Sequence, residues 1–149
     1  MAAGLHDYGE ELMMRDFFAE DVTKPNTIDI GLYNDAASPV SESDDLDALS
    51  GEPTGSAYAR QTLTIGSADM TIAENADANW QVNFEDVSFD VSDSTVTVDS
   101  YFVVVNYEST TAGDTEATDH LFSTASLESD ADLSGLSTLT VDPAGAWLS

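Results

Sequence analysis

The amino-acid sequence predicts a mainly β protein: a β-sandwich of jelly-roll or Greek-key type with one N-terminal amphipathic helix. Three observations support this fold class. Roughly eight short segments alternate apolar and polar residues, turn residues separate these segments, and helical spacing occurs only near the N-terminus. The length of 149 residues fits a single domain, which we divide into a helical segment at 1–24 and a sandwich at 27–148.

The helix is predicted within residues 4–20. Leu5, Tyr8 and Leu12 approximate the spacing of one helical face, and Pro25 disfavours helical backbone at the residue before it. A helix that packs only on its own domain is one interpretation. The alternative is a subunit interface, because the segment has more large apolar side chains than one narrow stripe needs. The candidate interface residues on the helix are Met13, Met14, Phe17 and Phe18.

The first strand is predicted at 27–34, where Ile28, Ile30 and Leu32 share one face of an extended chain. Near Glu85–Asp86 the alternation slips by one residue, which predicts a bulge or a bend. The same alternation predicts further strands at 57–65, 70–72, 80–84, 87–91, 95–107, 121–127, 139–141 and 146–148.

The segment 95–107 is expected to form a central strand. Residues 101–105 read YFVVV and are apolar on both faces, so this strand should be covered on both sides. Two acidic loops, at 36–56 and 108–119, are expected to face solvent, because burying their carboxylates would cost hydration. Within the first loop, Ser43 is the predicted cap of a short helical turn.

Net charge is the strongest compositional signal. The chain has 29 Asp and Glu against 3 Lys and Arg, a formal charge of −26 at pH 7. Such repulsion opposes compaction in dilute buffer and is screened at molar salt, whereas 42% hydrophobic residues argue against a disordered acidic tail. The composition therefore predicts a folded protein adapted to high salt. It excludes the basic surface that nucleic acid or an anionic membrane requires.

The motifs predict no enzyme. The sequence has no Gly-x-Ser-x-Gly motif, no glycine-rich phosphate loop and no cysteine, and His6 lies far from His120 in sequence. We therefore expect no cofactor and no specific metal site, only loosely bound cations at the acidic surface. We also expect synthesis in the cytoplasm without a signal peptide, and no membrane partner, because no apolar run approaches about 20 residues.

Arg60 is a candidate site residue because basic side chains are so rare in this chain, and it lies in the predicted strand 57–65. One interpretation is a local salt bridge to a nearby carboxylate, worth about 0–1 kcal/mol when exposed. The alternative is a bidentate anchor between strands or between subunits, for which the planar guanidinium is suited. Both interpretations stay open, and Arg60 is included in the candidate subunit interface.

Three segments together resemble a loose group of small virion proteins of tailed viruses. The group shares a strand ending in Gly-Leu-Phe or Gly-Leu-Tyr, a Gly-x-x-Tyr-Ala-Arg-Gln strand, and a late Leu-Phe-Ser stretch followed by Pro-Ala-Gly. The corresponding residues here are 28–34, 55–61, and 121–127 leading to 139–145. The resemblance covers residues 1–148 in outline. It departs in the middle, where Trp80 lacks the glycine that often follows it.

The resemblance implies a non-enzymatic β-sandwich module on the capsid exterior or the tail. Together with the composition, it predicts a virion structural protein of a tailed virus of halophilic archaea, a capsid decoration or vertex-turret subunit. Expected partners are further copies of the chain, the major capsid protein and the host cell surface. The alternatives are a tail or baseplate subunit, and a host β-sandwich binding module with exposed aromatic residues at Tyr58, Trp80 and Trp147.

Overall fold

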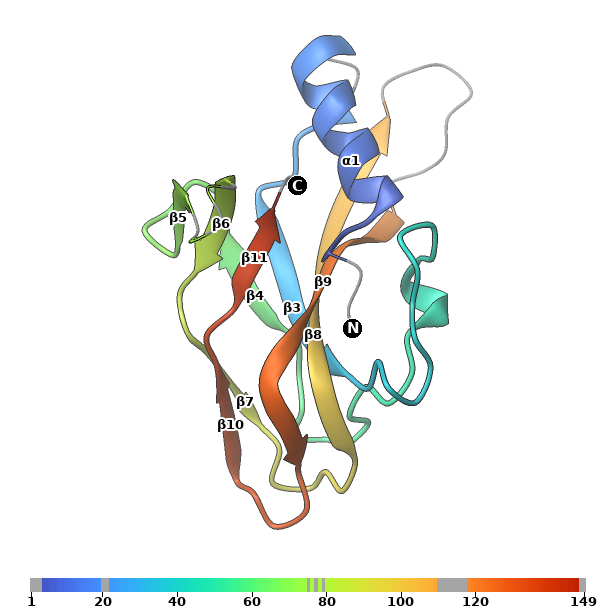
Figure 1. Cartoon of the computed structure of the whole chain (residues 1–149), viewed down its shortest axis with the longest axis vertical. Coiled ribbons are helices and arrows are strands. Elements are labelled where there is room, and N and C mark those ends of the chain that lie inside the picture. The colour runs from blue at the N-terminus through green and yellow to red at the C-terminus, as the bar shows by residue number, and fades with distance from the viewer. Residues whose placement is uncertain are drawn as a thin grey trace.

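A computed structural model describes residues 4–19, 22–74, 76, 78, 80–109 and 118–147, and it confirms the predicted fold class. The chain is mainly β and sandwich-like, with one N-terminal helix (Figure 1). The large sheet is antiparallel in the order β1-β9-β8-β3-β4, and β2 pairs with the end of β8. Its strands are β1 Gly4–Leu5, β2 Val22–Thr23, β3 Thr27–Tyr33, β4 Gln61–Thr64, β8 Thr97–Ser109 and β9 Thr118–Asp132.

The second layer consists of two small antiparallel sheets placed end to end. One has the order β11-β6-β5 and the other pairs β10 with β7. The break between β6 and β7 falls at Glu85–Asp86, as the slip in alternation predicts, and Phe84 donates its backbone N–H to the Pro143 carbonyl across it. These strands are β5 Met70–Glu74, β6 Trp80–Phe84, β7 Val87–Asp90, β10 Thr138–Val141 and β11 Ala144–Trp147.

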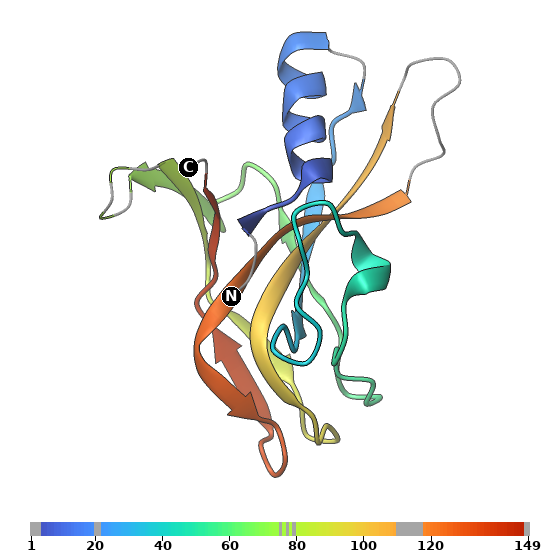
Figure 2. The same cartoon turned by 45° about the vertical axis from the view of Figure 1, so that its right-hand side comes forward.

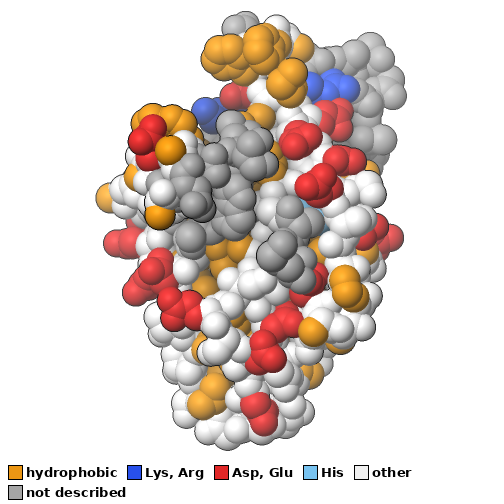
Figure 3. Space-filling model, viewed as in Figure 1, with side chains coloured by type: hydrophobic (Ala, Val, Ile, Leu, Met, Phe, Trp, Pro, Cys, Tyr) orange, Lys and Arg blue, Asp and Glu red, His pale blue; other side chains and the backbone are white. Residues whose placement is uncertain are grey.

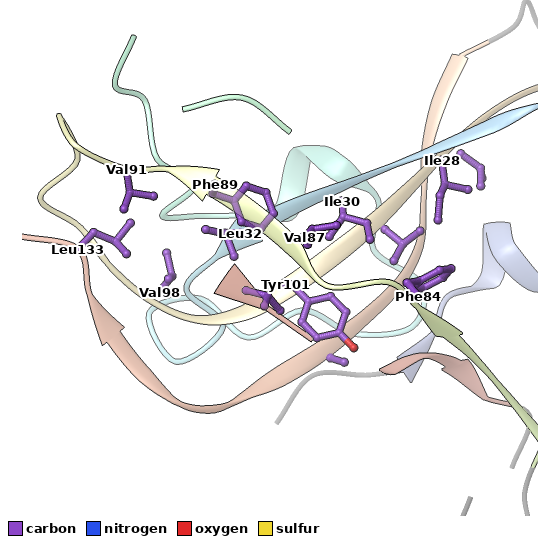
Figure 4. Close-up of a cluster of buried hydrophobic side chains, with 14 of the residues drawn as sticks. Ile28, Ile30, Leu32, Phe84, Val87, Phe89, Val91, Val98, Tyr101 and Leu133 are labelled. Carbon is purple, nitrogen blue, oxygen red and sulfur yellow. The ribbon is translucent and has the colours of Figure 1, made fainter. Parts of the chain in front are cut away.

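The main core fills the space between the two layers (Figure 4). It is built from the inward faces of alternating strands, so one strand contributes every second residue. β3 supplies Ile28, Ile30 and Leu32, as predicted, and the last two have no exposed surface. The second layer contributes side chains that include Phe84, Val87 and Phe89.

β8 is the central strand that the apolar run predicts. It pairs with β9 on one edge and with β3 on the other, and all five residues from Tyr101 to Val105 are buried. Val103 and Val105 face the main core, whereas Phe102 and Val104 face a second, smaller cluster on the opposite side of the sheet. The strand is therefore covered on both faces.

The cover on the second face is the loop at 36–56, which corrects the expectation that this loop faces solvent. Val40 is buried against Phe102 and Val104, and Leu46, Ala48 and Leu49 pack around the same cluster. The short helical turn is the 3-10 helix η2, Leu46–Ala48, and Asp45 rather than Ser43 caps it. In the second predicted loop, residues 110–117 lie outside the described residues.

The helix predicted within residues 4–20 is present over residues 7–19, so it begins later than predicted. It consists of α1, Asp7–Met14, followed by one turn of π-helix, η1, Arg15–Ala19. Leu5, expected on the helix, instead belongs to β1 and pairs with Ser123 of β9. Figure 2 shows α1 projecting from one end of the sandwich, beside the ends of β8 and β9.

The predicted strand 57–65 is shorter than expected, because β4 begins only at Gln61. Residues before it make hydrogen bonds that involve side chains instead of a backbone ladder. Ala57 donates its backbone N–H to the Asp93 carboxylate, and the Tyr58 hydroxyl accepts from the Leu32 N–H. Side-chain partners thus replace the ladder that alternation alone predicted.

β9 contains a large irregularity opposite the start of β8. Val98 pairs with Ala131, but Ser100 pairs with Ser126, so the single residue Asp99 lies opposite residues 127–130. This excess of residues on one strand bends β9 sharply, as the curved ribbon in Figure 1 shows.

Candidate docking surface

The helix end of the molecule exposes a cluster of large apolar side chains. Phe17 is 77% exposed and Phe18 is 72% exposed, and their rings form an edge-to-face pair with centroids 4.8 Å apart. Met14 and Met13 are exposed one turn earlier. These are the four helix residues that the sequence singles out as candidate interface residues. By contrast, Leu12 lies in the main core and holds α1 on the sandwich.

An apolar cavity of about 190 Å³ opens beside these residues. Its first wall is the helix, with Leu12 and Met13, and its second wall is the β5–β6 hairpin, with Val82 and Phe84. The large sheet forms the floor. Almost all of the lining is apolar, and Asp16 and Lys24 are its charged members.

The β5–β6 hairpin extends the apolar surface away from the cavity. Its register pairs Met70 with Phe84, Ile72 with Val82 and Glu74 with Trp80, and directly paired side chains share one face of a sheet. Met70, Val82 and Phe84 line the cavity, so Ile72 and Trp80 continue the same face towards the tip. These two side chains are 72% and 57% exposed. We call the exposed residues of α1 and η1, the cavity and this hairpin face the helix pole.

The helix pole carries charges of both signs, and its acidic residues include Glu10, Glu11 and Asp16. Arg15 and Lys24 lie there, which are two of the three basic residues in the sequence. The Arg15 Nε atom donates to Glu11 Oε1 at 2.8 Å, one turn back on the helix. Figure 3 shows hydrophobic and basic side chains together at this end, with Asp and Glu beside them and over the rest of the visible face.

Arg60 is not part of the helix pole. Its Nε and Nη2 atoms each donate to one carboxylate oxygen of Glu52 at 2.8 Å, and its guanidinium lies 4.9 Å from the ring centroid of Phe102. The hydrogen bonds to Glu52 raise the pKa of Arg60. Phe102 belongs to the second cluster, on the opposite face of the large sheet from the cavity. The pair is bidentate, but it is local, and it ties the loop at 36–56 to the start of β4.

The structure also shows a set of polar contacts around both histidines that the sequence did not predict, and we call this set of contacts the latch. His6 has no exposed surface; its Nδ1 lies 3.2 Å from the Asp44 carbonyl oxygen and its Nε2 lies 3.1 Å from Thr124 Oγ1. Because a carbonyl oxygen only accepts, Nδ1 carries the proton and neutral Nε2 accepts from the threonine hydroxyl.

The second histidine, His120, stacks on Tyr8 and its Nδ1 lies 3.0 Å from Asp45 Oδ2. The latch joins α1, β9 and the loop at 36–56.

The latch predicts a pH dependence of stability. Burial lowers the pKa of His6, although the nearby Asp44 carbonyl partly opposes the shift. Below the ordinary histidine pKa of about 6.5 the unfolded chain therefore binds a proton that the folded chain does not, and stability falls as the pH falls from there. We expect urea midpoints at constant high salt to decrease between about pH 6.5 and 5. His6→Gln, which does not titrate, should flatten this decrease; the same slope in both proteins would contradict the prediction.

In the part of the chain that the structure describes, no group of three or more His, Asp or Glu side chains is arranged to hold a metal ion. No described helix is long and apolar enough to cross a membrane. The chain matches no protein-family model, no curated protein and no solved structure.

Proposed function

We propose that this chain is a non-enzymatic structural protein of a tailed-virus virion, a capsid decoration or vertex-turret subunit that works at high salt. The observation that carries the proposal is the concentration of exposed aromatic and methionine side chains at the helix pole of a strongly acidic module. Such residues are enriched at protein interfaces. The resemblance of residues 28–34, 55–61, and 121–127 leading to 139–145 to small virion proteins supports the same proposal.

The proposal fixes an orientation on the particle. The helix pole contacts other copies of the chain and the major capsid protein, because burying one exposed Phe side chain contributes roughly 1.5–3 kcal/mol. The end of the sandwich that carries the β9–β10 turn then points outward, towards the host cell surface. Of the apolar residues in this turn, Leu133 is buried in the main core and Leu136 is 39% exposed, and the other turn residues are serine and glycine.

A cryo-EM map of purified particles tests the proposal. We expect density for the chain on the outside of the capsid, with the end of α1 directed at the particle. Density on the tail would overturn the capsid assignment in favour of a tail or baseplate subunit. Absence of the chain from particles, together with its presence in uninfected cells, would overturn the virion role in favour of a host binding module.

Rebinding of recombinant protein to particles that lack the chain tests the docking surface. Wild-type protein should bind at high salt, and the double variant Phe17→Ser/Phe18→Ser should not. Deleting the whole segment is a poor probe, because His6 and Leu12 are buried in the fold. Leu136→Ser is the matched control, since it also removes a partly exposed apolar side chain, but at the other end of the molecule. Equal binding of the double variant would contradict docking through the helix pole.

A further inference from the structure

The cavity in the helix pole has the size and chemistry of a receptor for one aromatic ring. An engineered apolar cavity of about 150 Å³ in another protein stays dry and binds benzene. The cavity here, at about 190 Å³, is lined almost entirely by apolar side chains and opens to the surface. An occupant of this chemistry would bury an apolar ring without leaving a polar group unpaired.

The same pole presents the rings that such a cavity accepts. Phe17 and Phe18 follow directly after Asp16, which lies on the cavity rim. Phe17 is the most exposed large apolar side chain among the described residues, and Phe18 is 72% exposed. Because the rings and the cavity are neighbours on one surface, a two-fold axis beside the pole would present the rings of each copy to the cavity of the other. A contact of this kind is self-complementary and closed.

Charge favours a second copy as the occupant. Two of the three basic residues, Arg15 and Lys24, lie at the helix pole beside the acidic Glu10, Glu11 and Asp16. Two chains of charge −26 therefore repel less at this end than where acidic residues are almost unopposed. The cavity rim carries one charge of each sign, Asp16 and Lys24. A two-fold arrangement that pairs Lys24 of one copy with the partner's Asp16 also makes the reciprocal pair, so that opposite charges flank each inserted ring.

We propose that two copies of this chain associate through the helix pole, each inserting one ring of its Phe17–Phe18 pair into the apolar cavity of the other. This inference specifies how copies of the chain contact each other, and it rests on the proposed function only for the biological role of that contact. Its test needs no particles. Absence of the chain from virions would overturn the proposed function and leave this contact standing, whereas a monomeric chain found on virions would do the reverse.

Sedimentation velocity at about 3 M KCl, where repulsion is screened, measures the association. Wild-type protein should associate. Phe17→Ser/Phe18→Ser removes the rings and leaves the cavity, whereas Val82→Phe fills the cavity from its hairpin wall and leaves the rings. Each variant alone should associate at least about 100-fold more weakly than wild type, and Leu136→Ser should associate normally. Circular dichroism at the same salt concentration serves as the check that each variant is folded.

Mixing the two variants distinguishes ring insertion from non-specific hydrophobic association. The intact rings of Val82→Phe can enter the intact cavity of Phe17→Ser/Phe18→Ser, so an equimolar mixture should form heterodimers although neither variant dimerises alone. A mixture that stays monomeric, a double variant that associates like wild type, or a wild-type chain that is monomeric at high salt would each overturn the proposal. If Val82→Phe does not fold, Ile65→Phe fills the same cavity from another wall.

Discussion

Transfer of the protein from about 3 M to about 0.1 M KCl is expected to remove most of its stability. The Debye length grows from under about 3 Å to about 10 Å over this range, so each carboxylate repels many more of its neighbours at the lower salt concentration. With 29 acidic residues and only 3 basic ones, few attractive contacts offset that repulsion. We expect a loss of several kcal/mol, a large part of the roughly 5–15 kcal/mol typical of a folded domain.

Circular dichroism during urea unfolding at several KCl concentrations measures this effect. Urea is the suitable denaturant because guanidinium chloride would itself change the ionic strength. A variant with four exposed carboxylates replaced by amides should need less salt for the same stability: Glu85→Gln, Asp86→Asn, Glu128→Gln and Asp130→Asn. Equal free energies of unfolding from low to high salt would show that charge repulsion does not govern the fold.

Replacing Asp45 with alanine is expected to lower the free energy of unfolding by about 2–4 kcal/mol. One carboxylate oxygen accepts from the N–H groups of Leu46 and Leu121 at 2.8 and 2.7 Å, and the other lies 3.0 Å from His120 Nδ1. Leu121 has no exposed surface. Its N–H would lose this charged partner, and the loop at 36–56 would lose its main tie to β9.

Two neighbouring variants serve as controls for Asp45→Ala. Asp47→Ala removes an exposed carboxylate from the same 3-10 helix and should change stability by no more than about 0.5 kcal/mol. Asp45→Asn keeps an oxygen that accepts from the backbone and should cost less than alanine. Urea unfolding at high salt gives all three values. Similar losses for Asp45→Ala and Asp47→Ala would mean that the hydrogen bonds of Asp45 do not set the free energy of unfolding.

The parts of the fold that follow from local patterns were predictable. Alternation at 27–34 and the apolar run at 101–105 gave β3 and the centre of β8, and a slip in phase gave the break between β6 and β7. The loop at 36–56 was not predictable in this way. Its apolar residues are separated by acidic ones, and they are buried only because the outer face of β8 needs a cover.

The site followed the same division. The N-terminal helix has more large apolar side chains than one face needs, which is a local signal. This signal identified Phe17 and Phe18, and the structure shows both side chains exposed. The cavity beside them is formed by α1, the β5–β6 hairpin and the large sheet, segments whose meeting no local pattern encodes. Asp45 was one carboxylate among 29 in the sequence, and only the folded chain brings it to His120.

The irregularity in β9 also affects how easily a foreign strand can add to the edge of the large sheet. β9 has fifteen residues, but among the described residues β1 pairs with only Ser123 and Thr124 of them. At low salt the exposed Glu128 and Asp130 disfavour the addition of a foreign strand to this edge, because charged side chains repel it. Molar salt screens such charges. The extra residues opposite Asp99 distort the edge at any ionic strength, so in brine shape can deter fibril growth where charge no longer does.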